Sequence, residues 1–266
     1  MGNSMSVALI GHSGFVGSTL KRQADFDALY RSTDIDGIRG HAFDLVICAG
    51  APAQKWLANR EPEADKRNME RLIDALRNVR CREFVLISTV DVFKDPRGVD
   101  ESTQPDDNGL HPYGANRLWL ERFVQDQFEA ARIVRLPGLV GPGLKKNIIF
   151  DLHHGNAVSA IDSRSVFQFY PMVNLWTDLV RTREAGLNCV HLTAEPLSVA
   201  EIALQGFGIR FEQVQQGCPA HYDFQSRHAG TFGAQGRYTY SARETMLAVR
   251  AYAQSEPKAG AGAAQA

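Results

Sequence analysis

The chain has 266 residues, of which 44% are apolar and 22% charged, and its formal net charge is −1. These values are ordinary for a globular protein with one large domain and room for a small lobe, and the balanced charge argues against a nucleic-acid partner. The longest apolar runs are strand-sized, which predicts no membrane span, and residues 1–6 lack the regions of a signal peptide. We therefore expect a cytoplasmic protein whose four scattered cysteines, which show no CxxC spacing, are free thiols.

Strand-like and helix-like segments alternate along the chain. This alternation predicts an α/β fold, a doubly wound parallel sheet (Rossmann) with a small C-terminal substrate lobe. The expected strands are residues 7–10, 28–32, 44–48, 84–87, 132–136 and 188–192. The expected helices follow the first strand as far as about residue 22 and then occupy residues 63–78, 112–128, 200–207 and 242–253.

The same pattern gives a domain organisation. We assign residues 5–143 to a dinucleotide-binding core and residues 144–255 to a mixed region. The mixed region is expected to hold the substrate lobe and elements that return to the core. Residues 256–266 are rich in glycine and alanine, have little to bury, and are predicted to be a disordered tail.

A glycine-rich run follows the first strand directly, with the spacing GxxGxxG rather than the GxGxxG of the standard dinucleotide fingerprint. Gly11 suits a tight turn, Gly14 lets a diphosphate approach the backbone, and Gly17 lets the helix pack closely on the sheet. The N-terminus of that helix offers N–H groups to phosphates, although such a turn also occurs without a ligand. The cofactor-binding candidates here are Gly11, Ser13, Gly14, Phe15, Val16 and Gly17.

Ligands of doubly wound sheets bind outside the carboxyl ends of the strands. The residues that follow the other strands are therefore further candidates for contact with the cofactor. They are Ala49, Gly50, Ala51, Ser88, Leu136, Pro137 and Gly138.

The end of the second strand bears on the choice between NADP and NAD. Arg31 and Ser32 suit a 2′-phosphate, which favours NADP. NAD-binding chains usually place an acidic residue in this region, and Asp34 or Asp36 fills that place if the strand is shorter than expected.

Two short motifs carry the chemistry. Tyr113 precedes Arg117 by four residues, which puts both on one face of a helix, and Thr89 and Asp91 follow the fourth strand. With the glycine turn and the segments at 135–143 and 192–203, these motifs occur in the order found in the extended short-chain dehydrogenase/reductase family. Over residues 5–250 the chain resembles that family, and in particular its sugar-nucleotide reductases, epimerases and dehydratases.

The resemblance implies roles for these residues. Tyr113 is expected to be the general acid/base of a hydride-transfer reaction and Thr89 to bind the reacting oxygen. The family has lysine where this chain has Arg117, which keeps the charge and can donate to the cofactor ribose but is larger and aimed differently. The alternative is a tyrosine packed at a helix start beside a solvated arginine.

Asp91 matches an acidic position of the family's dehydratases, so it is a candidate second proton carrier. Val90 stands where those enzymes have their other acid, and a loop-capping aspartate is an equal alternative. The histidines show no metal-ligand spacing, so no metal is expected.

Candidates for substrate contact lie in the mixed region. Lys145, Lys146 and Asn147 follow a glycine-rich loop and can meet an anionic group, or they form a solvated helix start. Gln168 and Tyr170 lie in an aromatic segment that suits either a ligand platform or the core.

We therefore expect an NAD(P)-dependent oxidoreductase or epimerase with a nucleotide-sugar or sugar-like small-molecule substrate. The alternatives are a non-catalytic NAD(P)-binding sensor or complex subunit, and a sugar-nucleotide dehydratase with tightly bound NAD. The helices at 63–78 and 112–128 can form a homodimer interface, although burial in the core explains their apolar side chains equally well.

Overall fold

The structure is a computed structural model that describes residues 5–258. It divides into two compact units. Unit 1 comprises Met1–Asp95, Glu101–Leu136 and Leu175–His191, and unit 2 comprises Pro96–Asp100, Pro137–Asn174 and Leu192–Ala266. The sequence predicts the end of the dinucleotide-binding core at Gly143, whereas unit 1 is interrupted after Leu136 in the structure. Most of the predicted disordered tail, residues 259–266, lies outside the described residues, as do residues 1–4.

Unit 1 is built on a six-stranded sheet in which every strand pairing is parallel. Its strands are β1 (Val7–Ile10), β2 (Ala28–Tyr30), β3 (Ala42–Cys48), β4 (Arg80–Thr89), β6 (Ala131–Leu136) and β10 (Cys189–His191). The spatial order is β10-β6-β4-β3-β1-β2, so the chain reverses direction across the sheet at β1 and β3. This is the doubly wound arrangement that the alternating pattern predicts, with its switch point beside the end of β1.

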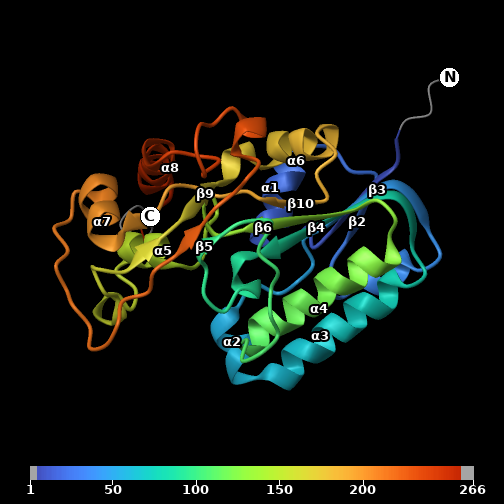
Figure 1. Ribbon diagram of the computed structural model, residues 1–266, viewed down its shortest axis with the longest axis horizontal. Helices are drawn as coiled ribbons and strands as arrows, with labels where there is room; N and C mark the ends of the chain where they lie inside the picture. The colour runs from blue at the N-terminus through green and yellow to red at the C-terminus, as the bar shows by residue number, and fades with distance from the viewer. Residues whose placement is uncertain (1–4, 259–266) are drawn as a thin grey trace, which may run out of the picture. The chain divides into compact units, whose positions relative to one another are not determined.

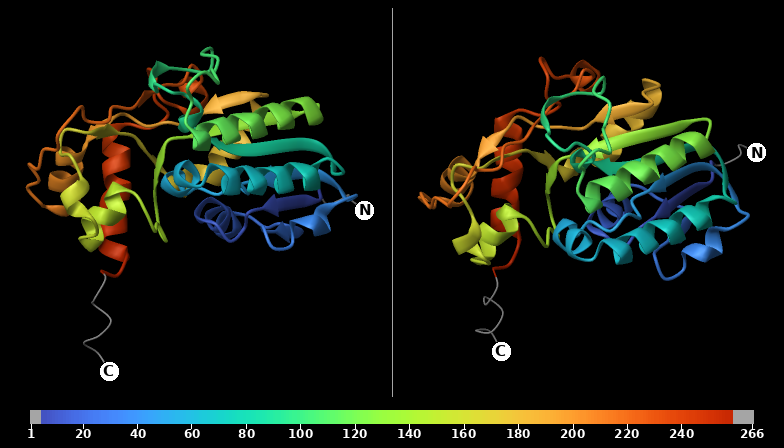
Figure 2. Two further views of the ribbon diagram at one scale, coloured as in Figure 1. Left: turned by 90° about the horizontal axis from the view of Figure 1, so that it is seen from below. Right: turned by 60° about the horizontal axis from the view of Figure 1, so that its bottom comes forward.

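Helices cover both faces of this sheet (Figure 1). The helices α3 (Pro62–Leu76) and α4 (Pro112–Gln127) run side by side on one face, as Figure 2 also shows. The helices α1 (Phe15–Gln23) and α6 (Leu175–Glu184) lie together on the other face, where the Trp176 amide donates to the Gln23 side chain at 3.0 Å. A short helix, α2 (Lys55–Arg60), precedes α3 and was not expected from the sequence. No helix within residues 5–258 is long and apolar enough to cross a membrane.

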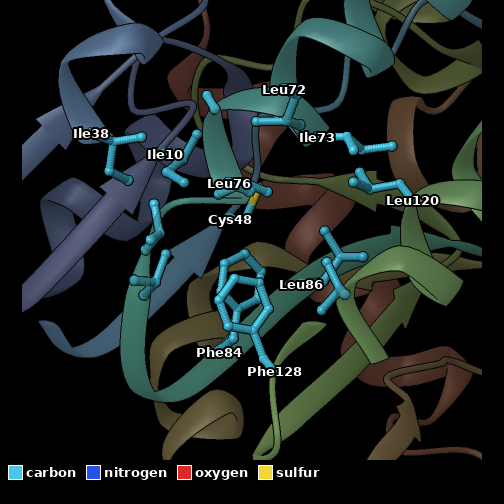
Figure 3. Close-up of a cluster of buried hydrophobic side chains, with 14 of the residues drawn as sticks. Ile10, Ile38, Cys48, Leu72, Ile73, Leu76, Phe84, Leu86, Leu120 and Phe128 are labelled. Carbon is cyan, nitrogen blue, oxygen red and sulfur yellow. The ribbon is translucent and has the colours of Figure 1, made fainter. Parts of the chain in front are cut away.

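The main core of unit 1 lies between the sheet and the α3–α4 pair (Figure 3). The expected apolar face of α3 is buried there, including Met69 and Leu76. The rings of Phe84 and Phe128 stack with centroids 4.3 Å apart. Cys48 is buried in the same cluster, and that burial raises the pKa of its thiol to about 12, so it is an inert apolar side chain rather than a nucleophile.

Several predicted boundaries were wrong for local reasons. β2 ends at Tyr30 rather than at residue 32, because the Tyr30 carbonyl accepts the Gly11 and His12 amides of the glycine turn. β4 runs from Arg80 to Thr89, longer than the apolar run at 84–87, because its first residues are polar but still pair with β3. The strand expected at 188–192 is shortened to Cys189–His191.

Within the described residues, unit 2 contains three helices and three pairs of short strands. The helices are α5 (Ile148–His154), α7 (Val199–Phe207) and α8 (Ala242–Ser255). The strand pairs are β7 (Gly138–Val140) with β9 (Phe169–Pro171), β8 (Val166–Phe167) with β11 (Leu197–Ser198), and β5 (Arg97–Val99) with β12 (Asp223–Phe224). The predicted helices α7 and α8 both begin at capping boxes, formed by Ser198 with Glu201 and by Ser241 with Glu244.

Short 3-10 helices complete the described chain. They are Ile35–Ile38 and Val90–Val92 in unit 1, and Val158–Ala160, Met172–Asn174 and Ala229–Phe232 in unit 2.

Candidate functional site

The glycine turn connects β1 to α1 at the carboxyl edge of the sheet. Gly11 has a φ of +84°, and a Cβ there would collide with the Ala49 carbonyl. A Cβ on Gly17 would collide with the Gly11 carbonyl, so both positions require glycine. Gly14 is different, because a Cβ there would meet only the Gly11 oxygen, at 3.5 Å.

Gly14 is also the N-cap of α1, and no side chain caps this helix. Gly14 has ordinary extended backbone angles, so neither strain nor crowding inside the protein explains the absence of a side chain. The N–H groups in the first turn of α1, such as those of Phe15 and Val16, thus follow a glycine that has no side chain to cover them. This geometry fits a diphosphate at a helix N-terminus.

The end of β2 lies against this turn. The Tyr30 carbonyl accepts the Gly11 amide at 2.7 Å, which places Arg31 and Ser32 directly after the contact. The Arg31 side chain is 54% exposed and pairs with Asp34 at 3.5 Å, while the Asp34 carboxylate also accepts the Arg31 amide. Both acidic candidates for the selection of NAD are therefore paired: Asp34 with Arg31, and Asp36 with Arg39 and Arg71.

The stretch from Ala49 to Ala51 follows β3 beside the same turn. The Ala49 amide donates to the Ile10 carbonyl at 2.9 Å, and a Cβ on Gly50 would meet the Ile10 side chain at 3.0 Å. These residues therefore border the glycine turn, as expected from their position after a neighbouring strand.

Thr89 and Tyr113 meet at the carboxyl end of β4. Thr89 caps the 3-10 helix Val90–Val92, its hydroxyl accepting the Asp91 amide at 3.2 Å. Gly114 packs so closely on the Asp91 carbonyl that a Cβ would collide with it, which brings the start of α4 against this turn. The Tyr113 amide is held by the Asn59 side chain at 3.0 Å.

Tyr113 is 7% exposed, and Thr89 lies beside its phenol. Burial raises the pKa of its phenol above the ordinary value, although the nearby Arg117 charge and the Thr89 hydrogen bond both act to lower that pKa. The phenol therefore holds its proton at neutral pH. In this state it is a proton donor rather than a base.

Arg117 occupies an unexpected environment. It is 2% exposed, and both of its terminal nitrogens form an ion pair with Asp65. One of these nitrogens also donates to the Pro52 carbonyl, and the guanidinium carbon lies 3.9 Å from the centroid of the Tyr113 ring. These bonds commit the terminal nitrogens to the protein, which favours a structural role and leaves the predicted contact with a ribose without support.

Asp91 pairs with a lysine that the sequence analysis did not single out. The Lys55 ammonium, at the start of α2, lies 2.7 Å from one Asp91 oxygen, and the Thr89 hydroxyl lies 3.5 Å from the other. The only sequence signal for Lys55 is its place a few residues after β3, beside the cofactor candidates 49–51. The structure thus brings Thr89, Asp91, Tyr113 and Lys55 together.

A second polar cluster lies beneath these residues. The Ser88 hydroxyl donates to Glu121, which forms an ion pair with Arg135 at 2.7 Å. Arg135 also approaches a ring nitrogen of His191 at 3.3 Å. Because Ser88, Glu121 and Arg135 are all buried, the structure favours a structural role for Ser88 over the predicted cofactor contact.

The remaining candidates close β6 or belong to unit 2. Leu136 is buried, and Gly138 lies against the Gln168 carbonyl. Gln168 is buried with its amide bonded to Thr193 and to two carbonyls, and Tyr170 is fully buried. For these two the structure favours the core alternative.

Lys145, Lys146 and Asn147 lie at the start of α5. The two lysines are exposed. Asn147 caps α5 by accepting the amides of Ile149 and Phe150, and its side chain also donates to the Leu139 carbonyl. Asn147 is therefore a helix cap, while the lysines keep their predicted access to an anionic group.

Within residues 5–258, no group of three or more histidine, cysteine, aspartate or glutamate side chains is placed to hold a metal ion.

Comparison with known structures gives the same fold over nearly the whole chain. A dTDP-4-dehydrorhamnose reductase from Bacillus anthracis, in complex with NADP, is 16% identical with a TM-score of 0.70, covering 94% of this chain and 98% of that chain. MoeE5, in complex with UDP-glucuronic acid and NAD, is 16% identical with a TM-score of 0.72, covering 94% and 99%. A UDP-galactose 4-epimerase is 16% identical with a TM-score of 0.70, covering 94% and 98%.

Sequence comparison identifies the family. No curated protein matches the chain. The model of the NAD dependent epimerase/dehydratase family matches residues 28–163, just over half of the chain. The chain therefore belongs to the NAD-dependent epimerase/dehydratase family, a branch of the extended short-chain dehydrogenases/reductases.

Proposed function

We propose that this chain is an NAD(P)-dependent reductase or epimerase that acts on a hydroxyl or ketone group of a nucleotide-linked sugar. The observation that carries the proposal is the placement of the Tyr113 phenol beside Thr89 at the carboxyl edge of the sheet. The open, uncapped turn at Gly14 lies at the same edge, two strands away. A proton donor and a diphosphate cradle at one edge are what hydride transfer from a dinucleotide requires.

Each residue has a distinct role in this proposal. Tyr113 gives a proton to the substrate oxygen, or takes it in the reverse direction, and Thr89 orients that oxygen. The backbone from Gly11 to Gly17 holds the diphosphate. The nicotinamide supplies the hydride when bound. Arg117 fixes the Tyr113 ring rather than touching the cofactor, because Asp65 and the Pro52 carbonyl occupy its terminal nitrogens.

The cofactor is proposed to be NADP rather than NAD. Arg31 is exposed beside the glycine turn, while the carboxylate of Asp34 is already paired with it. An unopposed acidic group at this place would favour the ribose hydroxyls of NAD. Solved structures of the same fold hold either NADP or NAD, so the proposed preference for NADP depends on this chain's own residues.

The substrate class rests on relatives and on two exposed lysines. MoeE5 is known in complex with UDP-glucuronic acid and with UDP-glucose. We propose that Lys145 and Lys146 meet the diphosphate of a similar nucleotide-sugar here.

A cytoplasmic location and a homodimer through α3 and α4 also stay predictions. At the proposed dimer interface, Leu118 is buried, whereas Trp119 is 36% exposed and available to a partner.

A non-catalytic NAD(P)-binding protein is the second candidate. The buried state of Arg117 favours it, since the cation that usually activates the tyrosine is neutralised by Asp65. A dehydratase is a third, favoured by the carboxyl group of Asp91, which lies beside Lys55.

Turnover of nucleotide-sugars separates these candidates. The purified protein is loaded with NADP or NAD and assayed with UDP-glucose, UDP-galactose, UDP-glucuronic acid and the corresponding dTDP-sugars. Tyr113→Phe should keep the cofactor but lose about 10²–10⁴-fold in kcat. Tyr252→Phe, in α8, is the matched control and should keep wild-type activity. Cofactor binding without turnover of any substrate would support the sensor, and release of water would support the dehydratase.

A further inference from the structure

Arg117 does not provide the site with a positive charge that solvent can reach. Its guanidinium is buried, and its charge is balanced by the bidentate contact with Asp65. A buried, neutralised ion pair cannot exchange protons with solvent, and a guanidinium does not give up its proton in proteins. Any proton that Tyr113 gives to a substrate must therefore be replaced by another route.

Lys55 provides such a route through two intervening side chains. The Thr89 side chain lies beside the phenol of Tyr113, close enough to act on its pKa. The Thr89 hydroxyl lies 3.5 Å from one oxygen of Asp91, and the Lys55 ammonium lies 2.7 Å from the other. Exposure rises along this series, from 7% for Tyr113 to 17% for the Asp91 side chain and 39% for the Lys55 side chain.

We infer that Thr89, Asp91 and Lys55 form a proton relay that connects the phenol of Tyr113 to solvent. This relay rests on the proposed function, because it serves a tyrosine that exchanges protons with substrate. It assigns Lys55, which lies outside the family motif, as a positioning and proton-supplying residue of the site.

The relay works in the reduction direction as follows. Asp91 takes a proton from the Lys55 ammonium, and its carboxyl group then turns and gives a proton to the Thr89 oxygen. Thr89 passes its own hydroxyl proton to the phenolate oxygen of Tyr113, which has given its proton to the substrate. Water reprotonates the neutral amine of Lys55. One O–H or N–H bond forms for each one that breaks, and no electrons are transferred.

Other titratable groups around the relay do not replace it. Burial and the Lys55 charge lower the pKa of His111, and its Nδ1 accepts the Gly114 amide at 3.0 Å, so His111 is a neutral helix cap. Arg117 is held by Asp65. Lys55 is therefore the group of this cluster that combines a transferable proton with substantial exposure.

The test compares Lys55→Met and Lys55→Arg with wild type in the substrate assay described above. Arginine retains the ion pair with Asp91 but is a far poorer proton donor than lysine. The relay therefore predicts that both variants lose on the order of 10–100-fold in kcat, with KM within about twofold of wild type. Lys21→Met, an exposed lysine in α1, is the matched control and should behave as wild type.

Two further readouts separate proton supply from structure. Imidazole buffer should restore kcat of Lys55→Met in proportion to its concentration, and it should not rescue Tyr113→Phe. The solvent deuterium isotope effect on kcat should be larger in Lys55→Met than in wild type. Asp91→Asn should show the same loss, with its folding checked by circular dichroism.

The outcomes are distinguishable. Wild-type activity in Lys55→Arg, or a loss in Lys55→Met that no buffer restores, overturns the relay and leaves the proposed function standing. A wild type without turnover, or an active Tyr113→Phe variant, overturns the proposed function and the relay with it.

Discussion

The guanidinium of Arg117 lies over the ring of Tyr113, 3.9 Å from its centroid, and is held there by Asp65. This contact couples the residue in place of the family lysine to the catalytic candidate through packing and charge. It joins α4 to α3 and to the segment after β3, since Arg117 also binds the Pro52 carbonyl. The pair is therefore a structural support for the site as much as a source of charge.

Replacing Arg117 should destabilise the fold. Arg117→Ala leaves Asp65 buried without its partner, so we expect a loss of about 3–5 kcal/mol in the free energy of unfolding. Arg117→Lys keeps the charge but cannot make both contacts at once, and should cost about 1.5–3 kcal/mol. Urea unfolding of both variants measures this. A fully stable Arg117→Lys variant with higher turnover would show instead that lysine is the better residue here.

The pH dependence of the reaction should follow the protonation of Tyr113. Burial raises the pKa of this phenol above its ordinary value of about 10. Reduction needs the protonated form, so kcat/KM for reduction should stay level through neutral pH and fall only above about pH 10. Oxidation needs the phenolate, so its rate should rise with pH over the same range. A reduction limb that falls near pH 7 would contradict this assignment.

Thr89→Ala provides a control for that profile. The Thr89 hydrogen bond lowers the pKa of Tyr113, so its removal should move the alkaline limb to higher pH.

Two glycine substitutions separate folding from cofactor binding. Gly17→Ala places a Cβ against the Gly11 carbonyl and should destabilise the protein by about 3 kcal/mol. Gly14→Ala meets only a contact of 3.5 Å, so its stability should fall by only about 0.5–1 kcal/mol, because alanine is a poorer N-cap residue than glycine. If a diphosphate packs on Gly14, the Kd for NADP should nevertheless rise about tenfold or more, which is about 1.4 kcal/mol. Calorimetric titration of the folded variant checks this, and an unchanged Kd would place the diphosphate elsewhere.

The choice of cofactor can be read from Arg31. Arg31→Ala should weaken NADP binding about tenfold and leave NAD binding within about twofold, because only NADP carries the 2′-phosphate. Arg82→Ala is the matched control, since Arg82 is an exposed arginine of the same unit that pairs with Asp44. Equal effects of Arg31→Ala on both cofactors would contradict the preference for NADP.

The sequence alone predicts the parallel sheet because strand-like and helix-like segments alternate along the chain. It also predicts that Gly11 and Thr89 lie at one edge, because residues after parallel strands share that edge. The place of Tyr113 at the site followed only from the family resemblance. The buried charges were missed. Glu121 and Arg135 look like surface residues in sequence, and their burial becomes evident only when α4 is packed on the sheet.

Lys55 was missed for a different reason. α2 is six residues long and buries only Ala58, so it has no apolar periodicity to mark it. Its pairing with Asp91 joins positions 36 residues apart in the chain. The partnership of Arg117 with Asp65 spans 52 residues in the same way, so the motif at Tyr113 and Arg117 could be identified but the environment of the arginine could not.

The last strand of the sheet has a consequence for synthesis of the chain. β10 pairs with β6, yet residues 137–174, which make up most of the chain between them, belong to unit 2. While the ribosome is still synthesising residues 137–174, β6 is an unpaired edge strand that other nascent chains can contact. Unpaired edge strands promote aggregation. A fragment that stops at Leu136 would keep this edge permanently, so it should be produced in isolation only with the strand Cys189–His191 grafted back.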